Sequence, residues 1–415
     1  MTSPQRATDR LDAVVIGAGW AGLGVSYWLA RHNLSHRVLE RGRIAETWRT
    51  QRWDSFLMNT PNIQTVMPGD RYNGTEPEGV FTRNQFVSML VDFAERNKLP
   101  VDTASNVTEL VAVDGGYRVS TGGGALYSKA VVIASGCLNC AIRPLPADAF
   151  LTDIVQLDAS NYRSAADLPD GAVLVVGSGQ SGAQIAEELV QTGRSVFLAT
   201  SRVGRLPRRY RGRDIMLWLD ESGMLDVRRE EVIRLAGRIP ARGVLGSQHT
   251  ISLQALGAQG IVLLGRLTDV EPDGRLSFAD DLGANIRFAD EASENAKRFI
   301  DDYIARAGIS AQPSEPDPAE MVGWRPAYEP PVSLDLAARN IATIIWCTGF
   351  KGDYRYMRIP GALDVGGQPV HTDGIGVVPG LYYAGLDFAS TRRSGIILAL
   401  AEEAPRLVEH IVGQS

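Results

Sequence analysis

The sequence has little cysteine and no long apolar run. Its three cysteines cannot supply the disulfide framework of a small secreted scaffold. No stretch of about 18 consecutive apolar residues is present, the length that a membrane-spanning helix needs. The first ten residues, MTSPQRATDR, are polar and lack the apolar segment of a signal peptide. We therefore expect a cytoplasmic protein without a membrane partner.

Positive net charge and metal-ligand clusters are also missing. The formal net charge is −6, whereas a protein that binds nucleic acid broadly is usually basic. The five histidines show no spacing typical of a metal site, and no Ser–His–Asp arrangement is recognisable. We therefore expect neither a nucleic-acid partner nor a metal, whereas association into a homodimer stays open.

Glycine, by contrast, is abundant. The chain holds 43 glycines, about 10% of its residues against a usual ~7%. They follow no Gly-X-Y period, which excludes collagen, and 44% hydrophobic residues are enough for a packed core. At roughly 150 residues per domain, the length predicts two or three domains. The glycine excess needs a local explanation, which the positions of the glycines supply.

The first glycine cluster lies in a strand–turn–helix pattern. Residues 12–17 (DAVVIG) predict a strand buried on both faces, residues 23–32 a helix, and residues 36–40 (HRVLE) a second strand. This order is typical of the beginning of a βαβ unit. The turn between the first strand and the helix is Gly17-Ala18-Gly19-Trp20-Ala21-Gly22.

This first turn has the GxGxxG spacing of a dinucleotide-binding site. Gly17 permits the tight turn, Gly19 lets the backbone approach a pyrophosphate, and Gly22 lets helix and strand pack closely. The helix N-terminus stabilises the phosphate charge. Glu40 ends the second strand and can accept hydrogen bonds from a ribose.

A second turn repeats the pattern behind the predicted strand 171–177 (GAVLVVG). Its sequence is Gly177-Ser178-Gly179-Gln180-Ser181-Gly182, in which Gly177, Gly179 and Gly182 hold the three glycine positions. No acid ends the following strand; Ser201 and Arg202 stand there instead. Because arginine and serine bind an adenosine 2′-phosphate that an acid would repel, the second nucleotide is predicted to be NADPH.

Arginine is concentrated just after this second site. Six arginines occur within twelve residues: Arg202, Arg205, Arg208, Arg209, Arg211 and Arg213. The acidic total and the lack of interleaved aromatic residues argue against a nucleic-acid patch. We interpret the cluster as phosphate binding together with a solvated face.

Spacing indicates two similar units in tandem. Gly17 and Gly177 lie 160 positions apart, and the predicted hairpin turns at Gly115 and Gly274 lie 159 positions apart. The predicted fold is therefore α/β, with two Rossmann-like dinucleotide-binding domains, the second inserted into the first. The expected domains are residues 1–165, 166–318 and 319–415, where the last segment completes the first domain and the Pro-rich residues 312–318 lead back to it.

Other elements complete this prediction. Residues 82–99 predict a helix with a capping box formed by Thr82 and Gln85. Residues 341–349 and 379–385 predict two short strands, and residues 393–412 a closing helix.

With two nucleotide turns in this order, the chain resembles the class B flavin-dependent monooxygenases. This family includes the flavin-containing, YUCCA-like and Baeyer–Villiger monooxygenases. Ser181 matches the GxGxSG form of the family's second turn, and the segments 134–136, 347–349 and 379–385 are similar to its strand ends and closing loop. The resemblance covers nearly the whole chain and implies FAD at the first turn and NADPH at the second.

The resemblance also implies particular cofactor contacts. Besides the residues already named, the positions that it assigns to FAD or NADPH are Trp48, Arg49, Gln180, Ser181, Thr348, Gly349, Gly385 and Asp387. It further implies a catalytic role for Asn59, six positions after an aromatic residue. An uncharged amide there could donate to the C4a-hydroperoxide of the flavin.

The chain departs from the family at one fingerprint. When the family's Tyr-Arg is aligned with residues 162–163, Thr152, Ile154 and Asp158 stand at the Phe, Gly and His positions of FxGxxxH. All three signature residues are absent, which leaves the subclass open.

The favoured function is an FAD-containing, NADPH-dependent monooxygenase. It would transfer one oxygen atom of O₂ through the flavin C4a-hydroperoxide to a small soft nucleophile, an amine nitrogen or a sulfur. Baeyer–Villiger oxidation and oxidative decarboxylation of a 2-oxo acid stay open, as does a non-catalytic redox sensor. A disulfide or quinone reductase also stays open, because Cys137 and Cys140 form a CxxC pair that could exchange electrons with a flavin.

Overall fold

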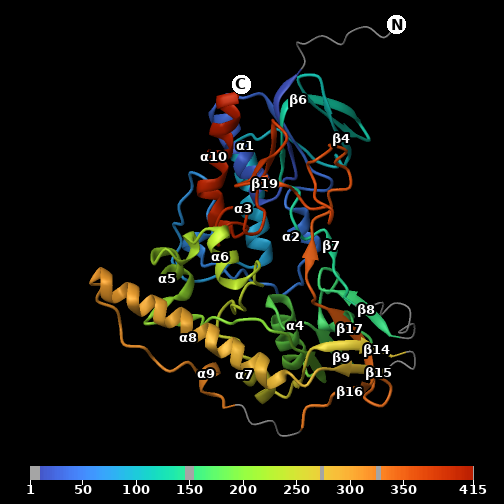
Figure 1. The fold of residues 1–415 in the computed structure, drawn as a ribbon, viewed down its shortest axis with the longest axis vertical. Helices are drawn as coiled ribbons and strands as arrows, with labels where there is room; N and C mark the ends of the chain where they lie inside the picture. The colour runs from blue at the N-terminus through green and yellow to red at the C-terminus, as the bar shows by residue number, and fades with distance from the viewer. Residues whose placement is uncertain (1–9, 145–153, 272–274, 324–328, 415) are drawn as a thin grey trace.

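The computed structural model describes residues 10–144, 154–271, 275–323 and 329–414 (Figure 1). They form two units, each built on a sheet with a parallel centre, which lie one above the other in the view of Figure 1. The predicted α/β class with two Rossmann-like units is confirmed. Thr152 lies outside the described residues, as do the turn residues around Gly274.

The first sheet has β1 near its centre. Its path is β19-β20-β21-β6-β1-β2-β3, and a β4–β5 hairpin extends it by pairing with β6. The strands are β1 (Leu11–Ile16), β2 (His36–Leu39), β3 (Val101–Asp102), β4 (Val107–Val113), β5 (Gly116–Thr121), β6 (Gly124–Ile133), β19 (His371–Thr372), β20 (Ile375–Gly376) and β21 (Leu381–Tyr383). The predicted hairpin forms with its turn at Asp114-Gly115, since Val113 pairs with Gly116.

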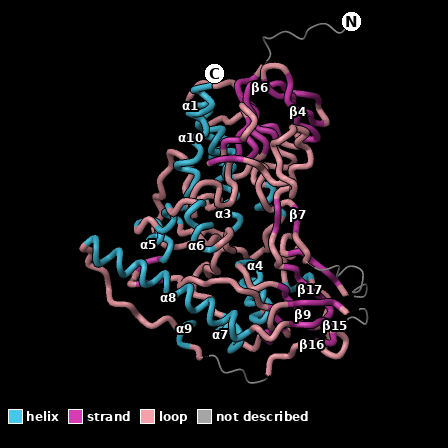
Figure 2. The backbone as a smooth tube through the Cα atoms, viewed as in Figure 1, coloured by secondary structure: helices cyan, strands magenta, loops and turns pink. Residues whose placement is uncertain are grey.

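Helices cover one face of this sheet. They are α1 (Trp20–Arg31), α2 (Glu46–Thr50), α3 (Arg83–Arg96) and α10 (Leu400–Gln414), with 3₁₀ turns at Asn62–Gln64 and Ile397–Ala399. α1 and α10 lie side by side (Figures 1 and 2). A Cβ on Gly24 of α1 would lie 2.4 Å from Leu400 of α10, so these two helices touch closely. The predicted capping box of α3 is present.

The second sheet is parallel throughout. Its order is β13-β10-β9-β17-β8. The strands are β8 (Val155–Asp158), β9 (Ala172–Val176), β10 (Val196–Ala199), β13 (Val262–Leu264) and β17 (Ile341–Trp346). A small antiparallel sheet packs beside it: β14 (Leu267–Val270), β15 (Arg275–Phe278) and β16 (Ser333–Asp335).

Helices and short ribbons surround this second sheet. The helices are α4 (Gln180–Gln191), α5 (Ile215–Glu221), α6 (Arg229–Ala236), α7 (Leu253–Ala258), α8 (Leu282–Ala307) and α9 (Pro318–Met321), with 3₁₀ turns at Ala165–Asp167 and Met224–Asp226. A two-stranded ribbon joins β11 (Arg209–Tyr210) and β12 (Arg213–Asp214). No helix in the described ranges has both the length and the apolar character needed to cross a bilayer.

Sheet membership differs from the expected division at residues 165/166 and 318/319. β8 and β17 lie outside residues 166–318, yet both belong to the second sheet, where β17 pairs with β9 on one side and β8 on the other. The predicted strand at residues 341–349 exists, but its apolar sequence fits either sheet. The two chain crossings between the units run side by side as a ribbon of β7 (Cys140–Ala141) and β18 (Phe350–Lys351), visible between the sheets in Figure 2.

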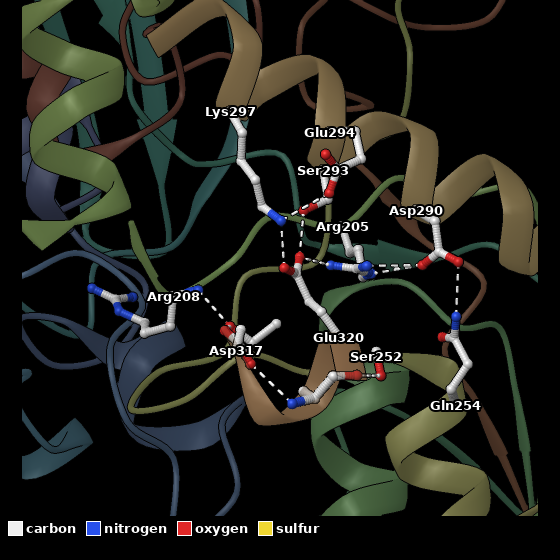
Figure 3. A network of polar contacts seen from close by, with 12 residues as sticks. Arg205, Arg208, Ser252, Gln254, Asp290, Ser293, Glu294, Lys297, Asp317 and Glu320 are labelled. Carbon is white, nitrogen blue, oxygen red and sulfur yellow. Dashed lines mark hydrogen bonds and ion pairs between the residues drawn. The ribbon is translucent and has the colours of Figure 1, made fainter. Parts of the chain in front are cut away.

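A buried polar network holds α8 and α9 against the second unit (Figure 3). Glu320 of α9 accepts hydrogen bonds from Arg205, Lys297 and Ser293. Arg205 also donates to Asp290 of α8 at 2.8 Å. Because Arg205 is only 5% exposed, the hydrogen bonds of this network replace those that water would make to its guanidinium.

The expected solvated arginine face is therefore wrong for two of its six members. Arg205 and Arg208 are buried, and Arg208 forms an ion pair with Asp214. Three of the remaining four form ion pairs: Arg209 with Glu78, Arg211 with Asp301, and Arg213 with Glu221. Their acidic partners are distant in sequence or in another element, so the arginine run alone could not reveal them.

Glu320→Ala tests the network. Burial raises the pKa of Glu320, but hydrogen bonds from Lys297 and Arg205 outweigh burial, and the net pKa is lowered. The stabilisation is thus complete above the carboxyl's ordinary pKa and is lost as pH falls through the lowered value. Because the variant leaves buried cations without their partner, we expect a loss of about 3 kcal/mol in the free energy of unfolding at neutral pH, measured by urea denaturation.

The exposed Glu315 supplies the control. Glu315→Ala should change the free energy of unfolding by less than about 0.5 kcal/mol. Equal stability of the Glu320→Ala and Glu315→Ala proteins would contradict a stabilising network.

Candidate functional site: two dinucleotide turns and a cavity

The first glycine turn is crowded at two positions and open at the third. Gly17 has φ +107°, and a Cβ there would lie 2.5 Å from the carbonyl oxygen of Ala134. A Cβ on Gly22 would lie 1.9 Å from the oxygen of Gly17. Nothing lies within 4 Å of a Cβ on Gly19, the N-cap of α1. The turn thus packs tightly against β6 and leaves free space before the helix N-terminus, where a phosphate fits.

The second turn repeats this construction. Gly177 has φ +104°, and its Cβ would lie 2.5 Å from the oxygen of Cys347. A Cβ on Gly182 would lie 1.8 Å from the oxygen of Gly177, whereas Gly179, the N-cap of α4, is clear. Both units therefore present an open helix N-terminus at the carboxyl end of a central strand.

A cavity of about 650 Å³ opens beside the first turn. It runs along the carboxyl ends of the first sheet's parallel strands. Of the predicted residues, its wall includes Gly17, Gly19, Glu40, Trp48 and Gly385.

Glu40 is buried in this wall. Its Oε2 accepts from the backbone N–H of Ala18 at 2.8 Å, and its Oε1 accepts from that of Gly42 at 2.9 Å. Each oxygen keeps a lone pair for a further donor. The carboxylate is thus fixed beside the turn, where a ribose hydroxyl could reach it.

Two of the residues predicted to contact a cofactor do not line this cavity and are hydrogen-bonded elsewhere. Arg49 donates from Nε to the carbonyl oxygen of Ile44 at 3.1 Å. Asp387 accepts from Nε of Arg242 at 2.8 Å. Neither contributes to the cavity wall.

The second turn is held by a side-chain clamp. Gln180 donates to the carbonyl oxygen of Leu245 at 2.7 Å and accepts from its N–H at 2.8 Å. Ser201 donates its backbone N–H to Ser178 at 3.0 Å. Thr348 donates its hydroxyl to the carbonyl oxygen of Ile142. These contacts fix the loops around the second turn.

Arg202 differs from its neighbouring arginines. Its guanidinium lies 4.6 Å from the ring centroid of Phe288 on α8, and its side chain is exposed. Within the described ranges it has no carboxylate partner, whereas the other five arginines of the cluster are paired. Arg202 therefore has donors free for an anion.

Asn59 lies at the junction of the units and is not part of the cavity wall. Its Oδ1 accepts from Ser247 at 2.7 Å and from Gln184 of α4 at 3.2 Å. Its carbonyl oxygen accepts from Arg208 at 2.8 Å. The two contacts to Oδ1 orient the amide so that Nδ2 faces away from Ser247 and Gln184.

The CxxC pair reaches the cavity at one residue. Cys137 lines the wall, whereas Cys140 belongs to β7 in the connection between the units. Both are free thiols, and burial raises the pKa of Cys137. A raised pKa keeps the thiol protonated and makes it a poorer nucleophile at neutral pH.

Three cavity residues escaped the sequence analysis: Arg52, Tyr356 and Glu403. Tyr356 is hydrogen-bonded to Ser135 at 3.2 Å, and burial raises its pKa to about 12. The only signal for Arg52 is its place in the aromatic-rich segment after Trp48. In the part of the chain that the structure describes, no three potential ligands cluster around a metal position.

Comparison with known sequences agrees with this geometry. The family model of the pyridine nucleotide-disulphide oxidoreductases matches residues 14–219. An uncharacterized CzcO-like oxidoreductase of Geobacillus kaustophilus is 27% identical over 97% of this chain and 98% of its own length. The indole-3-pyruvate monooxygenase YUCCA6 of Arabidopsis thaliana is 29% identical over 51% of this chain and 53% of its own.

Solved structures share the fold. A flavin-containing monooxygenase from Stenotrophomonas maltophilia has a TM-score of 0.67 at 18% identity, with 98% of this chain and 99% of that chain covered. The bacillithiol disulfide reductase of Staphylococcus aureus has a TM-score of 0.61 at 13% identity, covering 98% and 100%. OTEMO in complex with FAD and NADP has a TM-score of 0.58 at 15% identity, covering 97% and 86%.

The fold and its two turns are thus similar to those of flavoprotein oxidoreductases with two dinucleotide-binding units. Within that class the chain is similar to the class B flavoprotein monooxygenases, as the sequence resemblance implied. One of these neighbours, OTEMO, is in complex with FAD and NADP, the two cofactors that the sequence resemblance implies.

The two glycine environments of the first turn give a matched test. Gly19→Ala adds a methyl group to free space, so the protein should fold normally but bind FAD at least about tenfold more weakly. Gly22→Ala places a methyl group 1.9 Å from a carbonyl oxygen and should destabilise the fold by about 2 kcal/mol or more. Thermal unfolding and flavin-fluorescence titration separate the two effects.

Unchanged FAD affinity in Gly19→Ala would contradict the assignment of a pyrophosphate to this turn.

Proposed function

We propose that the chain is an FAD-containing, NADPH-dependent monooxygenase acting on a small molecule. The observation that carries the proposal is the pair of identically built glycine turns, of which one opens on a cavity large enough for a dinucleotide. When bound, FAD supplies hydride acceptance from the nicotinamide and the subsequent reaction with O₂. The protein's part is binding, orientation and electrostatics.

The cavity residues suit FAD. Gly19 and the α1 N-terminus would bind the pyrophosphate, and Glu40 would accept from the ribose. The partly buried Trp48 contributes an apolar surface to the cavity wall, and Cys137 also lines this wall.

The second turn suits NADPH. Gly179 leaves the α4 N-terminus open for a pyrophosphate, and Ser181 is in the first turn of that helix. Ser201 and the exposed Arg202 lie at the end of the next strand, where a 2′-phosphate would meet an unpaired guanidinium. Stacking on Phe288 restricts the rotamers of Arg202, which lowers the entropic cost of binding.

Asn59 is suited to the junction between the cofactors. Its Oδ1 is fixed by the second unit, so Nδ2 can act as a neutral donor in a water-poor site. We propose that this donor binds the reacting oxygen, with an amine nitrogen or a sulfur as acceptor of the transferred atom. Baeyer–Villiger oxidation and decarboxylation of a 2-oxo acid are the alternatives that product analysis distinguishes.

The main competing function is disulfide reduction, favoured by Cys137 in the cavity wall. We expect the wild type to consume O₂ in step with NADPH when an amine or sulfide substrate is supplied. The Cys137→Ser, Cys140→Ser double variant should keep this rate within about twofold, because its thiols take no part. An oxygen electrode measures the consumption of O₂, and NADPH absorbance measures the consumption of NADPH.

Reduction of disulfides by the wild type, abolished in the double variant, together with no oxygenated product, would overturn the monooxygenase in favour of a reductase.

Arg202→Ala tests the nucleotide preference. Loss of a charge-assisted contact to the 2′-phosphate should raise KM for NADPH about tenfold, or by about 1.4 kcal/mol, and leave KM for NADH unchanged. Arg298→Ala removes an exposed charge further along α8 and should change neither value. Equal effects of Arg202→Ala on both nucleotides would refute the 2′-phosphate assignment.

A further inference from the structure

An unpaired cation lines the cavity of the first unit. The guanidinium of Arg52 lies 4.8 Å from the ring centroid of Trp48 and 5.5 Å from that of Phe56. Its Nη1 donates to the carbonyl oxygen of Gln51 at 2.9 Å. Across the described ranges no carboxylate forms an ion pair with it. The group is held in place by aromatic rings and carries its charge towards the cavity.

The guanidinium of Arg52 stays protonated at neutral pH. Burial lowers the pKa of Arg52 to about 10, still well above 7. Taking a guanidinium partly out of water without an anionic partner is unfavourable. Such a cost is offset when a ligand brings the missing negative charge.

Other ionisable groups near this part of the cavity do not neutralise it. Glu403 lines the wall, its Oε1 is buried without a hydrogen-bond partner, and burial raises its pKa. Burial likewise raises the pKa of the neighbouring Cys137. Asp387 is engaged by Arg242. None of these three groups therefore compensates the charge on Arg52.

Strand order shows which half of a dinucleotide would meet Arg52. From the first turn after β1, the strands β2 and β3 lie on one side and carry Glu40 and Ser105 of the wall. Strands β6 and β21 lie on the other side and lead to Cys137 and Gly385. Arg52 and Cys137 both line the wall, and a charge on Cys137 would raise the pKa of Arg52, so the two groups are close and Arg52 belongs to the second side.

The direction of FAD follows from Glu40. A ribose at Glu40 places the adenosine half on the β2 side and the pyrophosphate at Gly19. The flavin then extends to the β6 side, where Arg52 lies. This step rests on the proposed function, since it requires FAD in the cavity.

We propose that Arg52 is an electrostatic partner of the flavin ring that makes the bound flavin easier to reduce. Oxidised flavin accepts a hydride, two electrons and one proton together, from NADPH, which leaves as NADP⁺. The neutral ring thereby becomes a reduced anion. A fixed cation beside the ring stabilises this anion more than the neutral oxidised form.

The test uses the full-length FAD-loaded protein and three variants. Arg52→Gln removes the charge, and Arg52→Lys keeps it. Arg83→Gln is the matched control, because Arg83 donates to the backbone oxygen of Arg52 and pairs with Asp54 but does not line the cavity. Anaerobic titration against a redox dye, followed by flavin absorbance, gives the reduced-to-oxidised ratio at a fixed potential.

In Arg52→Gln we expect this ratio to fall about tenfold, equivalent to about 30 mV for a two-electron couple. In Arg52→Lys the shift in potential should be at most half of that in Arg52→Gln, because the charge is kept. Arg83→Gln should leave the reduced-to-oxidised ratio unchanged. FAD affinity should change less than threefold in every variant. Circular dichroism establishes that each variant is folded.

Two results would overturn the inference while leaving the proposed function intact. One is an unchanged ratio in Arg52→Gln; the other is a folded Arg52→Gln protein that has lost FAD, which would make Arg52 an anchor for phosphate. If Arg52→Gln does not fold, Arg52→Met, which also removes the charge, takes its place with the same two outcomes, and an Arg52→Lys ratio as low as that of free FAD overturns the inference. Absence of FAD from the wild type would instead refute the proposed function.

Discussion

The close contact between a helix N-terminus and the end of its neighbouring strand is the constraint on which both units depend. In each unit a carbonyl oxygen, that of Ala134 or Cys347, lies where a side chain on the first glycine would be. The third glycine meets the carbonyl oxygen of the first. No side chain fits at these positions, and the middle glycine is left open. The same packing that builds the fold therefore also leaves two helix N-termini open to a phosphate.

The two sites then acquire different surroundings. Around the first, Glu40 is fixed by two backbone donors, and a cavity follows the strand ends. Around the second, Arg202 is the free arginine of a cluster whose other members are used within the fold. An acid at one strand end and an arginine at the other thus give two nucleotides different environments on one repeated framework.

The sequence predicted the parts of this framework that depend on local pattern. Both glycine turns, the capping box at Thr82 and the β4–β5 hairpin need only a few neighbouring residues, and each forms as expected. The partner of β17 could not be predicted, because the sequence of a buried apolar strand does not indicate which sheet the strand joins. The burial of Arg205 depends on Glu320, which is 115 positions away. Contacts of that kind are set by tertiary packing.

The candidate site divides along the same line. Gly19, Glu40 and Trp48 follow from spacing and line the cavity, whereas Arg49 and Asp387 are engaged elsewhere. Arg52 and Glu403 reach the wall from segments without a motif.

The most direct test of the central claim is anaerobic mixing of the purified holoprotein with NADPH, followed by air. Two functional dinucleotide sites predict one FAD per chain, bleached by NADPH and restored by O₂; a protein that retains no FAD, or whose FAD NADPH does not reduce, would contradict it.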